Sequence, residues 1–249
     1  MSRRVAALLL AVAVAAGCNA DKAVGSFADG GRGDSLPGDA VSGDAYGSGG
    51  SGNGVLRVSA VIEASEEVDN ASSADQFKAE LTVDVTRAGA AVTDAVVTIA
   101  SSAGTVTLSH EGSGRYTAEQ AGYARRYQLD VVAGADAVRG VRAEGPRIHT
   151  IDNPSEGARH PTAQPLEVRW TAGSATEVTV ESERMPRATT TDSGRFSIAG
   201  TYLTAEAGKE ETDRVRVRRS NVQLAAGGSA GSDVTVLVRN QVEFLIDAR

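Results

Sequence analysis

The chain has 249 residues, enough for about two domains, and carries a formal net charge of −7 with a single cysteine. Acidic residues outnumber basic ones by 32 to 25, which argues against wholesale binding to nucleic acid or anionic lipid, because such binding needs clustered cations. One cysteine cannot form an intramolecular bridge, so a disulfide framework is excluded.

Residues 1–17 have the layout of a secretory signal peptide. Arg3 and Arg4 give a cationic start, and an uninterrupted run of Val, Ala and Leu follows over 5–16. As a helix this run would be about 18 Å long, well short of the ~30 Å hydrocarbon core, so it is not expected to span a membrane. Its removal takes away two positive charges and leaves the mature chain at −9.

The run of small residues ends in Ala15-Ala16-Gly17-Cys18. This tetrapeptide resembles the lipobox of bacterial lipoproteins, in which small residues precede an obligatory cysteine. The resemblance implies that Cys18 receives a diacylglyceryl group, that the chain is cut before it, and that lipid then holds the new amino terminus on a membrane of the cell envelope. Asn19 in place of Asp favours the outer membrane over the inner one. The alternative is an ordinary signal peptide followed by an incidental cysteine.

Residues 18–54 are expected to form a disordered tether. Gly, Ser, Asp and Ala dominate this stretch, which closes with a Gly/Ser-rich run over 47–54. Such a composition cannot bury enough apolar surface to offset the entropy of ordering. A flexible coil of about 36 residues would span ~30–36 Å root-mean-square and would lift folded modules off a lipid surface.

Residues 55–145 are expected to fold as a first β-sandwich module. Apolar and polar residues alternate over 56–62 and over 77–86, and a period of two is typical of a strand with one buried face. Many short strands with no intervening helix favour a β-sandwich. Further strands are expected at 95–100, 105–109, 115–118, 127–132 and 138–143, with glycine-containing turns between several of them.

Residues 146–249 are expected to form a second module of the same kind. The alternation resumes with Leu166, Val168 and Trp170, and Gly145-Pro146 and Asn153-Pro154 bracket the expected joint. The predicted fold class is therefore all-β, with two tandem β-sandwich domains after a signal peptide and a disordered linker. Further short strands are expected around Val178 and Val180, Phe196 and Ile198, Val215 and Val217, Val222 and Leu224, Val234–Val238, and Val242, Phe244 and Ile246.

A short internal repeat connects the two modules. Ser113-Gly114-Arg115-Tyr116-Thr117 is matched by Ser193-Gly194-Arg195-Phe196-Ser197, and each is expected to open a strand after a tight turn. Two explanations stay open. Either the modules are related units, or the same hairpin chemistry arose twice.

The turn and strand pattern of the first module is similar to the immunoglobulin-like and carboxypeptidase-regulatory-like β-sandwiches of bacterial surface proteins. The residues that carry this similarity are 89–97, 112–116 and 127–131. In the second module, residues 154–170 resemble the opening strands of fibronectin-III-like domains. Members of these families mostly bind or space, and they share no catalytic residue, so the resemblance implies a non-enzymatic protein.

No catalytic, metal-binding or cofactor-binding residue is predicted. His110, His149 and His160 have no metal-ligand spacing to one another or to Cys18, and no serine lies in a nucleophile elbow. A hydrolase hidden in the loops would require His149 or His160 to lie beside an acidic residue and a serine.

One basic stripe is a candidate anion-binding site. Arg214, Arg216, Arg218 and Arg219 flank Val215 and Val217, and the first three arginines would share the polar face of one strand. At that spacing they could grip an anionic group. The alternative, which we prefer, is a solvated edge strand whose charges discourage aggregation between sheets.

Aromatic residues offer little surface for stacking sugars. Trp170 is in phase with its apolar neighbours and is expected in the core, as are Tyr116 and Phe196. The candidates for exposure are Tyr46, Tyr123 and Tyr202. The sequence therefore favours a lipid-anchored envelope protein whose modules act as spacers or bind another envelope protein, with no nucleic-acid partner. The alternative is binding of glycan or cell-wall polymer through loops of the second module.

Overall fold

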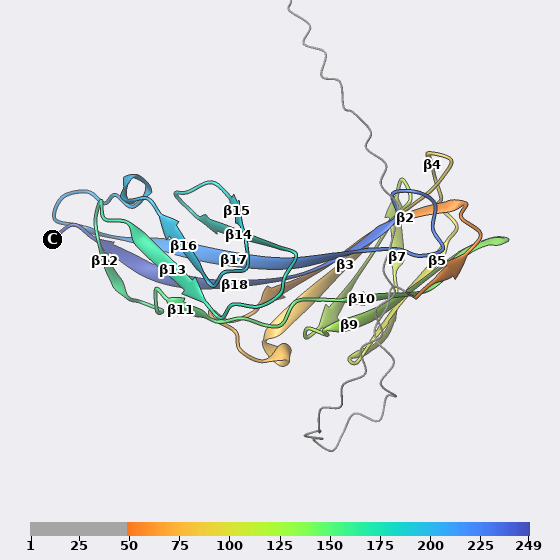
Figure 1. The fold of residues 1–249 in the computed structure, drawn as a ribbon, viewed down its shortest axis with the longest axis horizontal. Helices are drawn as coiled ribbons and strands as arrows, with labels where there is room; N and C mark the ends of the chain where they lie inside the picture. The colour runs from red at the N-terminus through yellow and green to blue at the C-terminus, as the bar shows by residue number, and fades with distance from the viewer. Residues whose placement is uncertain (1–48) are drawn as a thin grey trace, which may run out of the picture. The chain divides into compact units, whose positions relative to one another are not determined.

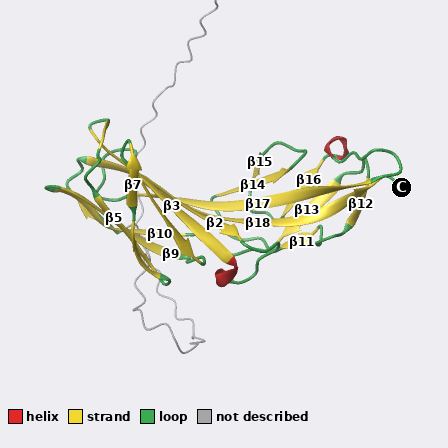
Figure 2. Ribbon diagram, turned by 180° about the vertical axis from the view of Figure 1, so that it is seen from behind, coloured by secondary structure: helices red, strands yellow, loops and turns green. Residues whose placement is uncertain are grey.

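The computed structural model describes residues 49–249, so the predictions for the signal peptide, Cys18 and residues 19–48 lie outside the described residues. The described chain is all-β. Figure 2 shows strands throughout, with two short helical turns at Ala74–Gln76 and Gly200–Tyr202. The predicted all-β fold class is confirmed.

The strands in chain order begin with those of the first half: β1 (Ser51–Gly52), β2 (Leu56–Glu66), β3 (Phe77–Arg87), β4 (Ala90–Ala91), β5 (Val96–Ser101), β6 (Gly104–Thr107), β7 (Ser109–Gly112), β8 (Arg115–Ala121), β9 (Arg126–Ala133) and β10 (Asp136–Glu144). The second half contains β11 (Ile151–Asn153), β12 (Arg159–Pro161), β13 (Leu166–Trp170), β14 (Glu177–Ser182), β15 (Ala188–Thr190), β16 (Arg195–Ile198), β17 (Glu210–Leu224) and β18 (Asp233–Asp247).

The first sandwich packs two sheets around one core. One sheet has the strand order β1-β10-β9-β5-β6, and the other is the β18-β2-β3-β8-β7 part of a ten-stranded sheet. Alternation in sequence creates the core: along β3 every second side chain from Phe77 to Val85 is buried, and the residues between them are partly or fully exposed. Opposite them, Ile99 and Leu129 fill the core from the smaller sheet.

The second sandwich is smaller. Its three-stranded sheet, in the order β11-β13-β16, contributes side chains to the same core as the β15-β14-β17-β18 part of the large sheet, and β12 pairs with β18. Trp170, Val217 and Phe244 lie in this second core. The core position predicted for Trp170 from its phase is therefore confirmed.

The two sandwiches share one long ribbon made of β17 and β18. Each residue of β17 pairs with a residue of β18, from Glu210 opposite Asp247 to Leu224 opposite Asp233, and Figure 1 shows the two strands side by side over their full length. The first half of β18 pairs with β2 of the first sandwich, and its last residues pair with β12 of the second. At about 3.3 Å per residue, 15 residues of strand extend roughly 50 Å.

The sequence pattern predicts four short strands where the structure has these two long ones. In β18 the even-numbered side chains from Val234 to Ile246 are buried without interruption, and the one polar member of that series is Asn240. A polar residue in a core-facing position breaks the apolar alternation, so one strand reads as two. The buried valines over 234–238 pack in the first core, so a boundary after residue 145 does not divide the two cores.

The end of the predicted tether is ordered. Ser51 and Gly52 form β1, which pairs antiparallel with β10. A Cβ atom on Gly52 would lie 2.3 Å from the carbonyl oxygen of Gly227, so this close backbone approach requires glycine. The disorder predicted for residues 51 and 52 is therefore wrong, and Gly50 and Gly52 instead lie tightly against the backbone of Ala226 and Gly227.

The two copies of the internal repeat adopt the same turn. Gly114 and Gly194 have φ angles of 76° and 78°, in the left-handed region that favours glycine, and the next residue begins β8 or β16. A Cβ atom would lie 2.5 Å from the Val85 carbonyl oxygen in the first copy and 2.9 Å from that of Trp170 in the second. The prediction that each copy opens a strand after a tight turn is confirmed.

Candidate functional site

The predicted stripe of Arg214, Arg216 and Arg218 lies on the outer face of β17. Over residues 215–220, β17 pairs with β14 on one side and with β18 on the other. The stripe therefore runs along an interior strand of the sheet. The preferred explanation, an edge strand protected by charge, is wrong because β14 covers that edge.

Each arginine of the stripe has a side-chain partner on β18 or, beyond β18, on β2. The guanidinium of Arg214 lies 2.9 Å from the carboxylate of Glu243, and that of Arg218 lies 2.9 Å from Glu63. The third arginine donates from Nε to Oε1 of Gln241 at 3.3 Å. Partly exposed cross-strand pairs of this kind stabilise a sheet modestly. Their carboxylates also neutralise guanidinium charge that would otherwise attract an anionic ligand.

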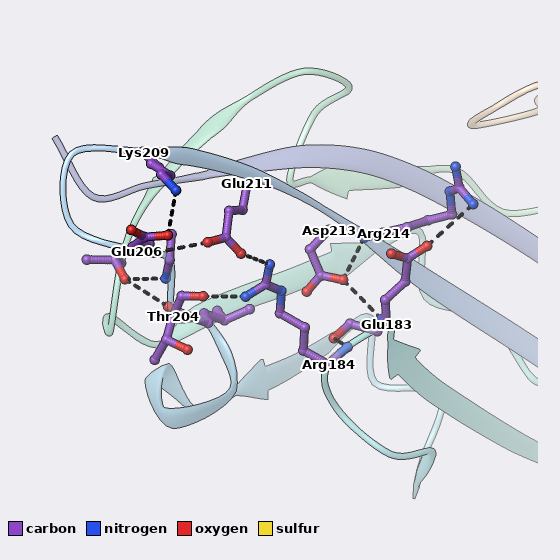
Figure 3. A network of polar contacts seen from close by, with 12 residues as sticks. Glu183, Arg184, Thr204, Glu206, Lys209, Glu211, Asp213 and Arg214 are labelled. Atoms are coloured by element: carbon purple, nitrogen blue, oxygen red, sulfur yellow. Dashed lines mark hydrogen bonds and ion pairs between the residues drawn. The ribbon is translucent and has the colours of Figure 1, made fainter.

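The stripe continues into a polar network around Asp213 (Figure 3). The wholly buried Asp213 carboxylate accepts hydrogen bonds from the backbone N–H groups of Glu183 at 3.0 Å and Arg214 at 2.7 Å. Nearby, the guanidinium of Arg184 pairs with the carboxylate of Glu211. These contacts fasten the loop after β14 to β17, which is a structural role.

A shallow hollow of about 370 Å³ lies on the outer face beside Arg218. Its other cation is Arg187, which pairs with Glu181 at 3.0 Å. Both cations that line this hollow are thus already neutralised, and the rest of its lining is mainly threonine and apolar side chains.

A different charged group lies where the chain passes from one sandwich to the other. Arg219 follows Val215 and Val217 on the core-facing side of β17 and is only 2% exposed. Its guanidinium forms an ion pair with Asp192 and donates from Nη1 to the Arg147 carbonyl oxygen at 3.2 Å. Its Nε is buried and has no hydrogen-bond partner within residues 49–249.

Asp192 is held as a carboxylate by several donors. Trp170 Nε1 donates to Oδ1 and the backbone N–H of Ala175 to Oδ2, each at 3.0 Å. The side chain is 4% exposed. Burial alone would raise its pKa, but these hydrogen bonds and the Arg219 guanidinium outweigh burial and lower the pKa below its ordinary value.

His149 lies near this ion pair and is buried. Burial and the positive charge of Arg219 lower the pKa of His149 to about 4, so the ring is neutral at pH 7. Its Nε2 lies 3.1 Å from the Val217 carbonyl oxygen and donates to it. The more exposed His160 contacts the Gln164 carbonyl oxygen. Within residues 49–249, neither ring bonds to a serine or a carboxylate, so they do not form the arrangement that a loop hydrolase needs.

A cleft of about 290 Å³ opens beside this group. Three arginines line it, Arg125, Arg147 and Arg219, together with the backbone of residues 172–174. A Cβ atom on Gly173 would lie 1.7 Å from Nη2 of Arg219, so glycine is needed for the backbone to pass over the guanidinium. The cleft is therefore built around one fixed, buried arginine.

The charges in the cleft do not cancel. Arg125 pairs with Glu144 at 2.6 Å, and Arg219 pairs with Asp192. Arg147 is exposed and forms no ion pair in the described part of the chain. Three cations against two carboxylates leave one net positive charge, so this cleft is the candidate binding site.

Only part of this site can be predicted from the sequence. Arg219 follows the stripe directly in the sequence, and its phase is the useful signal, because it falls on the side of Val215 and Val217 that faces the core. Asp192 lies in a loop, and no periodicity marks it. Tyr123 was a candidate for exposure, but it is buried, and its hydroxyl donates to the Pro146 carbonyl oxygen at 2.5 Å at the edge of the same region.

Among the described residues, no helix has both the length and the apolar character needed to cross a bilayer. Residues 49–249 also contain no cluster of three or more His, Cys, Asp or Glu side chains arranged to hold a metal ion.

Comparison with known proteins gives no family. No family model and no curated protein sequence matches the chain. Among solved structures, the D0-D1 domain of intimin is 14% identical, covers 76% of this chain and 99% of its own, and has a TM-score of 0.25. The IG1+IG2 pair of DIP-gamma is 9% identical (74% and 97% covered, TM-score 0.23), and the fibronectin(III)-like modules of Clostridium thermocellum CbhA are 13% identical (76% and 92%, TM-score 0.23).

Proposed function

We propose that this chain is a lipid-anchored, non-enzymatic protein of the bacterial cell envelope whose two sandwiches form one stiff spacer that binds a protein partner. The anchor is argued from Cys18, the only cysteine, at the end of a signal-peptide pattern. Asn19 after it favours the outer membrane. Immunoglobulin-like and fibronectin-like sandwiches are consistent with spacing and binding.

The observation that carries the spacer is the shared ribbon of β17 and β18. Domains joined by one linker usually move relative to each other. Here β18 contributes buried side chains to both cores, and β17, which contributes to the second core, pairs with β18 from one end to the other. Bending the joint would require the breaking of ladder hydrogen bonds and the buried ion pair of Arg219 with Asp192.

The anchor is tested by labelling cells that express the full chain with radioactive palmitate. We expect label in the wild-type protein and in the matched control Ser26→Ala, and none in Cys18→Ser. In detergent phase partitioning, the wild-type protein and Ser26→Ala should enter the detergent phase, and Cys18→Ser should remain in the aqueous phase. Label in Cys18→Ser, or none in the wild type, would contradict lipid attachment at this residue.

The partner is tested with the mature chain immobilised and exposed to envelope extract, in parallel with an array of envelope polysaccharides. The proposal expects a protein to be retained at moderate salt, and the same protein to be recovered by crosslinking in intact cells. Retention of polysaccharide alone would replace the protein-binding role with the glycan-binding one.

A further inference from the structure

We propose that the cleft beside Arg219 binds a carboxylate group carried by an acidic segment of the partner protein. This inference rests on the proposed protein-binding function and names the chemistry of the contact. It concerns the lining described above, with Arg147 at the rim and Arg219 at the inner end.

The rim supplies an available cation. Arg147 is exposed and makes no ion pair with any described residue, whereas Arg125 across the cleft is partly neutralised by Glu144 at 2.6 Å. The arginines of the β17 stripe, in contrast, all have side-chain partners on β18 or β2. Within the described chain, an incoming anion therefore meets an unpaired guanidinium here.

The inner end supplies a fixed cation. The Arg219 guanidinium is held by Asp192 and by the Arg147 carbonyl oxygen, and the backbone at Gly173 passes directly over it. Its side chain is 2% exposed, and its buried Nε has no partner in residues 49–249. A group that is already immobilised loses little entropy when a ligand binds, which favours affinity from few contacts.

Charge and size point to a single carboxylate. The three arginines, Glu144 and Asp192 sum to one net positive charge, so one monoanion neutralises the cleft, whereas a phosphate dianion would reverse its sign. A planar carboxylate also matches the fork of a guanidinium. The volume of about 290 Å³ lies at the lower end of ligand pockets, which suits one acidic side chain better than a large molecule.

The probe for this site is the blocked peptide acetyl-Gly-Glu-Gly-amide, titrated into the ¹⁵N-labelled mature chain at constant ionic strength. The backbone amides of Gly173 and Ser174 report on the cleft by NMR. We expect saturable shifts at these two residues, none with the Gln version of the peptide, and weaker binding as salt is raised.

Two variants make the test specific. Arg147→Gln should fold normally because the side chain is exposed, and it should weaken binding by about fivefold. Arg139→Gln is the matched control, since Arg139 is exposed on β10, has no ion pair with the described residues and does not line the cleft; it should leave binding unchanged.

Three results would overturn the proposal: no saturable shift at Gly173 and Ser174, equal shifts with the Gln peptide, or inorganic phosphate that binds as tightly as the Glu peptide. Each would leave the anchored spacer standing, because that proposal is judged by palmitate labelling and by capture of a partner. Loss of the anchor would in turn leave the peptide titration unaffected.

Discussion

Asn240 and Ala71, 169 positions apart in the chain, exchange two hydrogen bonds through the Asn240 side chain. Its Nδ2 donates to the Ala71 carbonyl oxygen at 2.8 Å, and its Oδ1 accepts from the Ala71 N–H at 3.0 Å. Nδ2 also donates to the His149 carbonyl oxygen at 2.7 Å. One buried amide on β18 thus holds both the loop after β2 and the connection between the sandwiches.

Replacing Asn240 with alanine should destabilise the protein by about 3 kcal/mol, because three buried backbone groups lose their partner. Urea unfolding followed by circular dichroism measures the loss. The control is Asn53→Ala, which removes an exposed hydrogen bond to Asp136 and should cost no more than about 0.5 kcal/mol. Equal costs for the two variants would contradict the clamp role of Asn240.

Breaking the buried ion pair should be more costly than breaking an exposed one. Asp192→Asn leaves the Arg219 charge buried without a counterion and should cost about 3–5 kcal/mol at pH 7. Asp84→Asn removes an exposed pair with Arg115 and should cost about 1 kcal/mol or less. The folded-state pKa of Asp192 is lowered, so its stabilisation is present above the ordinary pKa of Asp and is lost as the pH falls through the lower folded value. A cost for Asp192→Asn that does not shrink in acid would contradict this.

His149 should make the protein less stable in mild acid. Its folded pKa is lowered to about 4, whereas the unfolded chain takes up a proton near the ordinary value of about 6.5. The free energy of unfolding should therefore fall by up to about 1.4 kcal/mol per pH unit between these values as the pH drops. His149→Gln should lose this component of the slope, and His160→Gln should keep it. Parallel pH profiles for wild type and His149→Gln would show that His149 is not the group responsible.

The shared ribbon should couple the unfolding of the two sandwiches. Leu81→Ala opens a cavity in the first core and should cost about 2–5 kcal/mol. Trp170, the only tryptophan, lies in the second core and reports on it by fluorescence. The fluorescence transition should move to lower urea together with the circular dichroism transition. An unchanged Trp170 transition would mean that the sandwiches unfold independently.

The sequence predicts local structure here better than it predicts long-range pairing. The alternation over Phe77–Val85 correctly gives β3 and its buried face, because one sheet face meets a core and the other meets water. Nothing local states that β18 pairs in parallel with β2, since that pairing joins residues more than 170 positions apart. Asn240 interrupts the apolar alternation of β18, so the sequence does not show that the strand is continuous. The residue is polar because its side chain forms hydrogen bonds to distant backbone groups inside the core.

The candidate site follows the same rule. Arg219 and Asn240 each occupy a position where the alternation of their strand predicts a buried apolar residue. A polar residue at such a position indicates a buried polar contact, and this can be predicted from the sequence. The partner of Arg219, Asp192, lies in a loop. Whether the Arg147 guanidinium has an ion-pair partner depends on which carboxylates the fold brings close to it. These are facts of tertiary packing, which no local pattern contains.

Distances between the two sandwiches test the central claim most directly. In a Cys18→Ser background, Val96→Cys and Tyr202→Cys provide two exposed labelling sites, 57% and 40% exposed, one on each sandwich. Spin labels at these positions, measured by double electron–electron resonance, should give one narrow distance distribution, because β17 and β18 fix the sandwiches to each other. A broad or multimodal distribution in the folded protein would contradict a single stiff spacer.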